Sequence, residues 1–261
     1  LGIIYFPSPN TRLSLSGATG FRAPNIDDLA RIFESNTASR QLIIPNPNIK
    51  PEYTYNVDFA VNQSIAQIVK LEATGYYTQF RNAIALAADQ LNGKDSVNYN
   101  GLVSKVFSNQ NVNRADLYGF NAAVTLDLTR QLRFLSTINY TQGRYKKEDK
   151  NEVPLDHIPP VFGKTSITYT HSKLKVDIYA LYNGWKRISD YNINGEDNVQ
   201  YATKDGTPPW TNFNIKTSLN LVKNLSLQLG IENIADRNYR YFASGFSAPG
   251  RNFIMAIRGT F

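Results

Sequence analysis

The sequence predicts an all-β protein, a transmembrane antiparallel β-barrel, and three observations support this prediction. Apolar and polar residues alternate with a period of two, as in Leu225–Glu232, where every odd position is apolar. The alternating runs reach about 10 residues, which rise ~23 Å when tilted and match the ~25 Å apolar band of outer-membrane barrels. Short turns also alternate with long loops along the chain, as they do between the two ends of such barrels.

A soluble β-sandwich is the alternative architecture, because it would bury the apolar face against a second sheet. Sandwich strands are commonly shorter, about 5–6 residues, and their connections have no reason to be uniformly short at one end. Aromatic residues near the strand ends, such as Tyr140, Tyr182 and Trp185, also fit the interfacial girdles of a membrane barrel. The barrel is therefore favoured.

Composition excludes several classes of protein. The 261 residues are 42% hydrophobic, too many for a disordered chain, and they contain no Cys, so no disulfide scaffold, thiolate metal site or Cys nucleophile is available. No apolar run is long enough for a helical membrane span. The formal net charge of +7 suggests an anionic partner, such as lipopolysaccharide phosphates or an anionic ligand. Because the basic residues are spread along the chain, no nucleic-acid partner is expected.

Alternation and turn residues together predict eleven strands. Their expected ranges are Leu1–Tyr5, Arg12–Phe21, Tyr53–Gln63, Ile68–Phe80, Val106–Leu128, Leu132–Arg144, Phe162–Thr170, Leu174–Ile188, Phe213–Val222, Leu225–Ile234 and Asn252–Phe261. Bacterial single-chain barrels have an even number of strands, and an open sheet edge would leave backbone groups unpaired in lipid. We therefore expect that the chain is part of a larger barrel and that Leu1 is not its natural start.

The connections between these strands differ in length. The short turns lie at Pro7–Asn10, Ile65–Gln67, Thr129–Gln131, Ser172–Lys173 and Lys223–Asn224. The long loops lie at Arg22–Pro51, Ile84–Val106, Tyr145–Pro160, Ser189–Trp210 and Ala235–Gly250. Within the first long loop, Asn25 is a suitable cap for a short helix that would extend to Phe33. The Asn and Pro residues at 46–51 predict turns that lead back into a strand.

Six short motifs follow one another along the chain. They are GFRAP at 20–24, DDL at 27–29, NPNIKPE at 46–52, PLDHIPP at 154–160, ENIADRNYR at 232–240 and PGRN at 249–252, before the terminal Phe261. In this order they resemble the motifs of TonB-dependent outer-membrane receptors. The resemblance implies a 22-stranded barrel plugged by an N-terminal domain, of which residues 1–261 would be the C-terminal part without the plug and the first strands. It also implies that Phe261 belongs to the signal read by the barrel-assembly machinery.

The same resemblance implies a function. The full protein would lie in the outer membrane of a Gram-negative bacterium with its long loops extracellular. It would import a scarce ligand into the periplasm, using energy that TonB delivers through the plug. Heme receptors of this family have a His between the first and third motifs, whereas residues 25–45 contain neither His nor Tyr. The resemblance therefore points to a ferric siderophore or a similar chelate rather than heme.

Candidate ligand-binding residues are the Arg and aromatic residues of the predicted loops, because these side chains favour anionic or ring-bearing ligands. They are Arg22, Arg40, Tyr191, Tyr201, Trp210, Arg240 and Arg251. Alternative functions are a docking subunit of an outer-membrane complex, a passive porin and an outer-membrane enzyme.

Nothing in the sequence predicts catalysis or a resident metal or cofactor. His157 and His171 lack a second ligand at metal-binding spacing and are expected to be ordinary surface residues. The stretch 190–195 matches the first half of a calcium loop, but Tyr201 stands where a bidentate Glu is required. No nucleophile, metalloprotease or phosphate-loop motif occurs, so the protein is not expected to be an enzyme.

Overall fold

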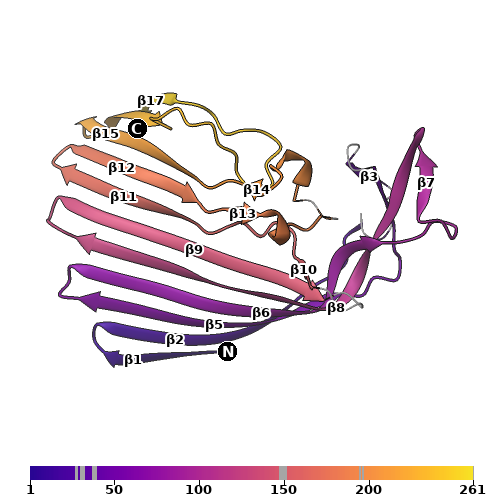
Figure 1. Cartoon of the computed structure of the whole chain (residues 1–261). Helices are drawn as coiled ribbons and strands as arrows, with labels where there is room; N and C mark the ends of the chain where they lie inside the picture. The colour runs from indigo at the N-terminus through magenta and orange to yellow at the C-terminus, as the bar shows by residue number, and fades with distance from the viewer. Residues whose placement is uncertain are drawn as a thin grey trace.

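The computed structural model describes residues 1–26, 29, 33–36, 40–146, 152–193, 195 and 197–260, with the side chains of 33–36 and 113 left out. Eleven strands of this part form one curved antiparallel sheet in chain order, so that each hairpin neighbour in sequence is also a neighbour in space (Figure 1). They are β1 (Gly2–Ser8), β2 (Thr11–Arg22), β5 (Glu52–Ile65), β6 (Val69–Ala88), β8 (Leu102–Asp127), β9 (Leu132–Lys146), β11 (Phe162–His171), β12 (Leu174–Asn183), β15 (Trp210–Val222), β16 (Leu225–Glu232) and β17 (Asn252–Gly259). The prediction of an all-β fold with eleven strands is confirmed.

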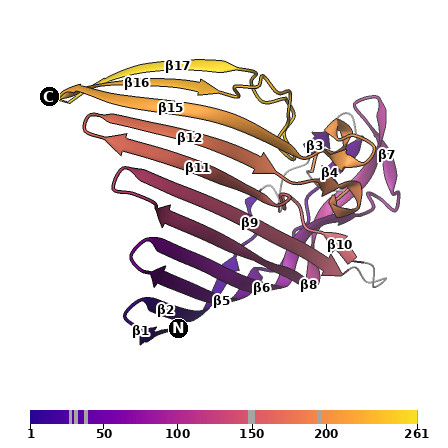
Figure 2. The same ribbon diagram turned by 60° about the vertical axis from the view of Figure 1, so that its left-hand side comes forward.

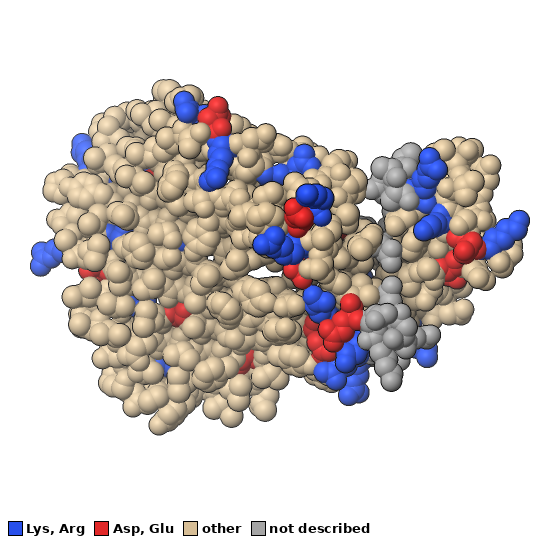
Figure 3. Space-filling view, viewed as in Figure 1, with Lys and Arg blue, Asp and Glu red and all other residues tan. Residues whose placement is uncertain are grey.

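The two faces of the sheet differ as the alternation predicts. On β5, Val57 and Phe59 are 50% and 49% exposed on one face, which we call the outer face. Asp58 lies on the opposite, inner face and accepts a hydrogen bond from Ser16 Oγ of β2 at 3.1 Å. An exposed sheet face of large apolar side chains is stable only against lipid or a protein partner. In the space-filling view the strands are largely free of charge, and charged residues gather toward the ends (Figure 3).

All the short turns lie at one end of the sheet and all the long loops at the other (Figures 1 and 2). The register of the strands fixes this arrangement, since each hairpin pairs directly from its turn, as Ile65 with Val69 and His171 with Leu174. No helix in the described part of the chain is long and apolar enough to cross a membrane.

The first long loop folds back against β8. Its strands β3 (Phe33–Asn36) and β4 (Gln41–Ile44) form a hairpin, and β4 pairs in parallel with β8. Leu42 and Val106 are each 1% exposed in this contact. The turn predicted at 46–51 is confirmed, because Asn46 Oδ1 accepts a hydrogen bond from Asn48 N at 3.1 Å. The third motif therefore has a clear architectural role.

Three sequence predictions need correction. The eighth strand ends at Asn183 and not at Ile188, because after a last bond from Gly184 N to Val161 O at 2.6 Å the chain pairs with a different segment. The short strand β13 (Lys186–Arg187) then pairs with β14 (Gly206–Thr207), and a 3₁₀ turn, η1 (Ile188–Asp190), follows.

The other two corrections concern loops. The predicted loop Ile84–Val106 is largely strand, because β6 continues to Ala88, β8 begins at Leu102, and β7 (Ser96–Tyr99) pairs with β8. The predicted helix cannot extend to Phe33, where β3 begins. Ile26 and Leu29 are helical, while most of the remaining helix positions and Phe261 lie outside the described residues.

Candidate functional site

A cavity of about 340 Å³ opens among the long loops near the start of β15. Trp210 and Tyr239 line it and form a cluster of three rings together with Tyr241. The Trp210 ring lies 4.3 Å from Tyr239 and 4.9 Å from Tyr241, measured between ring centroids. Trp210 is only 6% exposed, and its indole Nε1 donates to Arg240 O at 3.1 Å. We call this cavity the aromatic pocket.

Two positively charged side chains, Arg237 and Arg240, line the aromatic pocket. Arg240 Nη1 donates to Tyr201 O at 3.1 Å, and the guanidinium carbon lies 5.4 Å from the centre of the Tyr201 ring. Arg237 Nη1 donates to Thr211 O at 3.2 Å. A guanidinium beside aromatic rings suits an anionic ligand that carries rings of its own.

The sequence builds this pocket through buried asparagines on β15 and after β16. Asn212, Asn214 and Asn233 are each 2% exposed. Asn212 Nδ2 donates to Tyr239 Oη at 2.7 Å, and Asn214 Oδ1 accepts from Asn233 N at 3.0 Å. Asn233 in turn accepts from Arg237 N at 2.9 Å through Oδ1. The fifth sequence motif therefore anchors the loop that carries Tyr239 and Arg240.

The electrostatics of the pocket come from its arginines. Partial burial, together with the neighbouring Tyr239, raises the pKa of Tyr241 to about 12. Burial also raises the pKa of Tyr191, whose hydroxyl shares a hydrogen bond of 2.6 Å with Thr207 Oγ1 at the pocket wall. Both phenols therefore stay neutral at physiological pH and do not oppose the charge of Arg237 and Arg240.

A second group of charges lies on the inner face farther along the same strands. Lys164 of β11 and Lys216 of β15 have their ammonium groups 4.3 and 5.6 Å from the centre of the Tyr179 ring. Lys216 also forms an ion pair of 2.8 Å with Glu232, and Lys164 one of 3.6 Å with Asp177. The inner face beyond the aromatic pocket is thus polar and carries both signs of charge.

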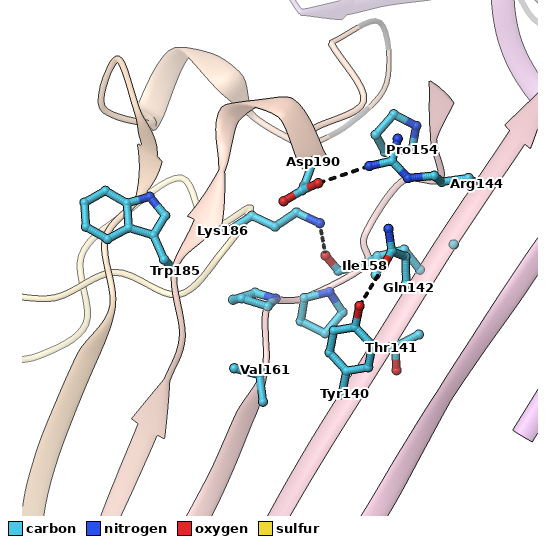
Figure 4. Close-up of a pocket in the computed structure, with 13 residues that line it drawn as sticks. Tyr140, Thr141, Gln142, Arg144, Pro154, Ile158, Val161, Trp185, Lys186 and Asp190 are labelled. Atoms are coloured by element: carbon cyan, nitrogen blue, oxygen red, sulfur yellow. Dashed lines mark hydrogen bonds and ion pairs between the residues drawn. The ribbon is translucent and has the colours of Figure 1, made fainter. Parts of the chain in front are cut away.

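Figure 4 shows a smaller cavity, of about 230 Å³. It adjoins the aromatic pocket through the β13–β14 pair, because Lys186 lines the one and its partner Thr207 lines the other. Lys186 reaches into the smaller cavity from β13 and donates from Nζ to Ile158 O at 2.6 Å, while Arg144 and Asp190 pair at 3.1 Å. Lys186 is 5% exposed, and burial lowers its pKa. Asp190 offsets part of the positive charge of Arg144 and Lys186 in this cavity, whereas no carboxylate among the described residues lines the aromatic pocket beside its two arginines. The aromatic pocket is therefore the better site for an anionic ligand.

The structure brings three of the seven predicted ligand-binding residues together, since Tyr201, Trp210 and Arg240 all line the aromatic pocket. Tyr191 lies behind its wall, 3% exposed and packed edge-on against Phe242. Arg251 lies at the base of the last loop, where its Nε donates to Ile234 O at 2.9 Å.

The two remaining candidates lie elsewhere. Arg22 pairs with the buried Glu52 at 3.5 Å, and Glu52 also accepts a hydrogen bond from Ile84 N at 2.9 Å. Arg40 is exposed, with a φ of 50°, and its carbonyl accepts from Lys105 N at 2.8 Å. These contacts tie loops to the sheet and do not place either guanidinium in the pocket.

Sequence reasoning missed Arg237, Tyr239 and the asparagines as parts of this site. The signal for the first two was present, because both stand in the fifth motif beside Arg240. Within the described residues, no group of three or more His, Asp or Glu side chains is placed to hold a metal ion.

Comparisons with known proteins agree with this architecture. Residues 1–234 match the family described as "TonB dependent receptor-like, beta-barrel". Among curated relatives, the "Probable hemoglobin and hemoglobin-haptoglobin-binding protein 4" of Haemophilus influenzae is 27% identical over 305 residues, covering 100% of this chain. The chain spans 29% of the length of that relative.

Solved structures give the same fold. The "Copper transporter OprC" aligns with a TM-score of 0.76 and 19% identity, covering 100% of this chain and 38% of its own. A mutant of the ferric enterobactin receptor PfeA from Pseudomonas aeruginosa aligns with a TM-score of 0.75 and 18% identity, covering 100% and 39%. The family consists of outer-membrane receptors and transporters rather than enzymes, as predicted. This chain belongs to the TonB-dependent receptor β-barrel family.

Proposed function

We propose that the full protein imports a scarce ligand, a ferric siderophore or a similar metal chelate, across the outer membrane with TonB-derived energy. The observation that carries this proposal is the aromatic pocket, where Trp210 and Tyr239 stand beside the guanidinium of Arg240. A chelate already saturates its metal, so its receptor needs charge and ring contacts rather than metal ligands. Ferric siderophores are commonly anionic, which the two arginines of the pocket suit.

Heme or hemoglobin is the second candidate ligand. It is favoured by the Haemophilus influenzae relative, which is described as a probable hemoglobin and hemoglobin-haptoglobin-binding protein. Against it, residues 25–45 contain no His or Tyr that could bind heme iron axially from this loop. The chelate is therefore the better supported ligand.

The remaining features of the whole protein are part of the same proposal. Residues 1–261 would form the C-terminal part of a 22-stranded barrel, with the plug and its TonB contact elsewhere in the protein. The long loops would face outward and capture the ligand, and the inner face would line its path. Lipid and lipopolysaccharide of the outer membrane would surround the apolar face, and no nucleic-acid partner is expected.

Growth of a deletion strain on defined iron sources tests this proposal. We expect lost growth on one ferric chelate, lost uptake of the same chelate labelled with radioactive iron, and unchanged growth on heme and hemoglobin. If the deletion strain loses growth on hemoglobin alone, heme or hemoglobin is favoured as the ligand. Unchanged uptake of every chelate, with lost growth on cobalamin or a sugar, would overturn the iron assignment and retain the transporter.

A further inference from the structure

Two arginines stand directly opposite each other on neighbouring strands of the outer face. Arg81 of β6 pairs with Arg114 of β8 in the sheet register, and Arg81 also pairs with Tyr53, which belongs to the exposed face of β5. Directly opposed like charges destabilise a sheet. This pair therefore calls for a compensating negative charge.

The protein supplies only part of that charge. Asp116 lies two residues along β8 and accepts from Arg114 Nε at 3.0 Å through both carboxylate oxygens. Tyr77 donates to the same carboxylate and accepts from Arg114 Nη2, the latter at 2.8 Å. Arg81 forms no ion pair within the described part of the chain, and its guanidinium carbon lies 5.2 Å from the centre of the Tyr55 ring.

Two further basic residues near the pair, in the part of the chain that the structure describes, have acidic partners of their own. Arg144 of β9 lies opposite Asp116 in the register but forms its ion pair with Asp190 at 3.1 Å. Lys146 lies 3.9 Å from Glu152. The exposed Arg81 is thus the one positive charge among these residues that has no acidic partner. Arg114 beside it has one such partner, the carboxylate of Asp116, which also accepts a hydrogen bond from Tyr77.

The depth of the pair in the membrane is set by the strands. Below it the outer-face rows of β5, β6 and β8 are apolar or aromatic except for Gln63, from the row of Ile65, Val69 and Leu126 near the turns up to the row of Val57, Tyr77 and Tyr118. The ten residue-to-residue steps from Ile65 to Tyr55 rise about 33 Å along the strand, or ~23 Å along the membrane normal at a tilt near 45°. The arginine pair therefore lies just beyond the apolar band, at headgroup level on the side of the long loops.

We propose that Arg81 and Arg114 bind a phosphate of a phosphorylated glycolipid in the outer leaflet. A phosphate accepts paired hydrogen bonds from guanidinium groups and would neutralise the opposed arginines, while Tyr53 and Tyr55 lie at the level where the sugar headgroup meets the acyl chains. At this depth, on a face that points toward lipid, the available anion is a lipid headgroup. The inference rests on the proposed orientation of the loops, but the site is on the opposite face of the sheet from the aromatic pocket and is independent of its ligand.

The test uses the full receptor, purified in mild detergent and incubated with lipid A carrying both phosphates. Native mass spectrometry counts the glycolipid molecules that each protein retains. We expect the double variant R81Q/R114Q to retain about tenfold less of this lipid at limiting concentration, as expected for the loss of charge-assisted hydrogen bonds. Conversely, the D116N variant should retain more lipid A than the wild type, because the substitution removes a carboxylate that competes with the phosphate for Arg114.

Two controls make the result specific. Lipid A treated with phosphatase should bind the wild type and the double variant equally weakly. K173Q removes one positive charge at the turn end of the sheet, where Lys173 Nζ donates to Leu221 O at 3.3 Å, and it should retain lipid as the wild type does. Unchanged retention by a folded R81Q/R114Q, equal loss in K173Q, or equal loss of the dephosphorylated lipid would each overturn the proposal. If the double variant fails to fold, unchanged or lower retention by D116N would do so.

Discussion

Asn233 shows how one residue links a sequence motif to the site. Its buried side chain accepts from Arg237 N at 2.9 Å and donates to Arg237 O at 2.8 Å and to Pro249 O at 3.2 Å. These bonds close the loop between β16 and β17 at both ends. The loop carries the Arg and Tyr side chains of the aromatic pocket, so the motif acts on the site through backbone positioning.

Replacing Asn233 by Ala should therefore loosen this loop. Each buried backbone group left without a partner costs about 1–3 kcal/mol, so N233A should lower both the unfolding temperature and the affinity for the ligand. Heat-modifiability on gels and equilibrium ligand binding measure the two effects. N224A, at an exposed turn, is the matched control and should change neither. A fully stable N233A with normal affinity would contradict the anchoring role.

Trp210 provides the direct test of the pocket. W210A removes two ring contacts, with Tyr239 and Tyr241, and should weaken binding of a ferric chelate about tenfold while the barrel stays folded. Titration of the purified receptor with the chelate measures this. The chain contains one other Trp, and W185A should bind normally, because Trp185 lies at the neighbouring cavity. Equal losses in both variants would argue against the aromatic pocket as the binding site.

Residue types alone predicted part of this site. Tyr201, Trp210 and Arg240 converge, because they stand on loops that the barrel topology brings to one place. Arg22 and Arg251 have the same chemistry, yet their local partners, Glu52 and Ile234, hold them elsewhere. Which arginine has such a partner depends on contacts between distant segments, and a single sequence does not reveal them.

At the scale of elements, the period of two was sufficient wherever a strand crosses the membrane. Lipid on one face and water on the other impose strict alternation there, so β5, β9 and β16 lie close to their predicted ranges. Beyond the apolar band this constraint disappears. The extensions of β6 and β8 and the pairing of β4 with β8 depend on contacts such as Leu42 with its neighbours on β8, which alternation does not encode.

Opposite faces of β16 should respond oppositely to a charge. Leu229 pairs with Met255 of β17 on the outer face, where the two side chains are 47% and 69% exposed, respectively. L229R should cost about 2–4 kcal/mol near the midplane, whereas Q228R, on the inner face, should be tolerated. Folding into bilayers, followed by the heat-modifiable gel shift, compares them. The face assignment fails if the two variants fold equally well or equally poorly.

At the scale of the whole molecule, the described sheet has two free edges. β1 pairs only with β2 and β17 only with β16, and the two edge strands are not paired with each other. Outer-face side chains at these edges are strongly exposed, for instance Ile3 at 63% and Ile257 at 65%. Within a bilayer the unpaired backbone groups of such edges find no water, so a stable barrel must pair both of them with further strands.

We expect those further strands to belong to the same polypeptide. If they belong to the same polypeptide, denatured intact-mass spectrometry of the native outer-membrane protein will give far more than the 29.4 kDa of these residues. This outcome is favoured by the aligned structures, because this chain covers only 38% of the length of the copper transporter and 39% of that of the enterobactin receptor. A native chain of 29.4 kDa would instead require closure between copies, with β1 of one pairing with β17 of another. Disulfide trapping between Cys residues introduced at Ile4 and Ile254 would detect that pairing as a covalent oligomer, and such a result would replace the half-barrel interpretation.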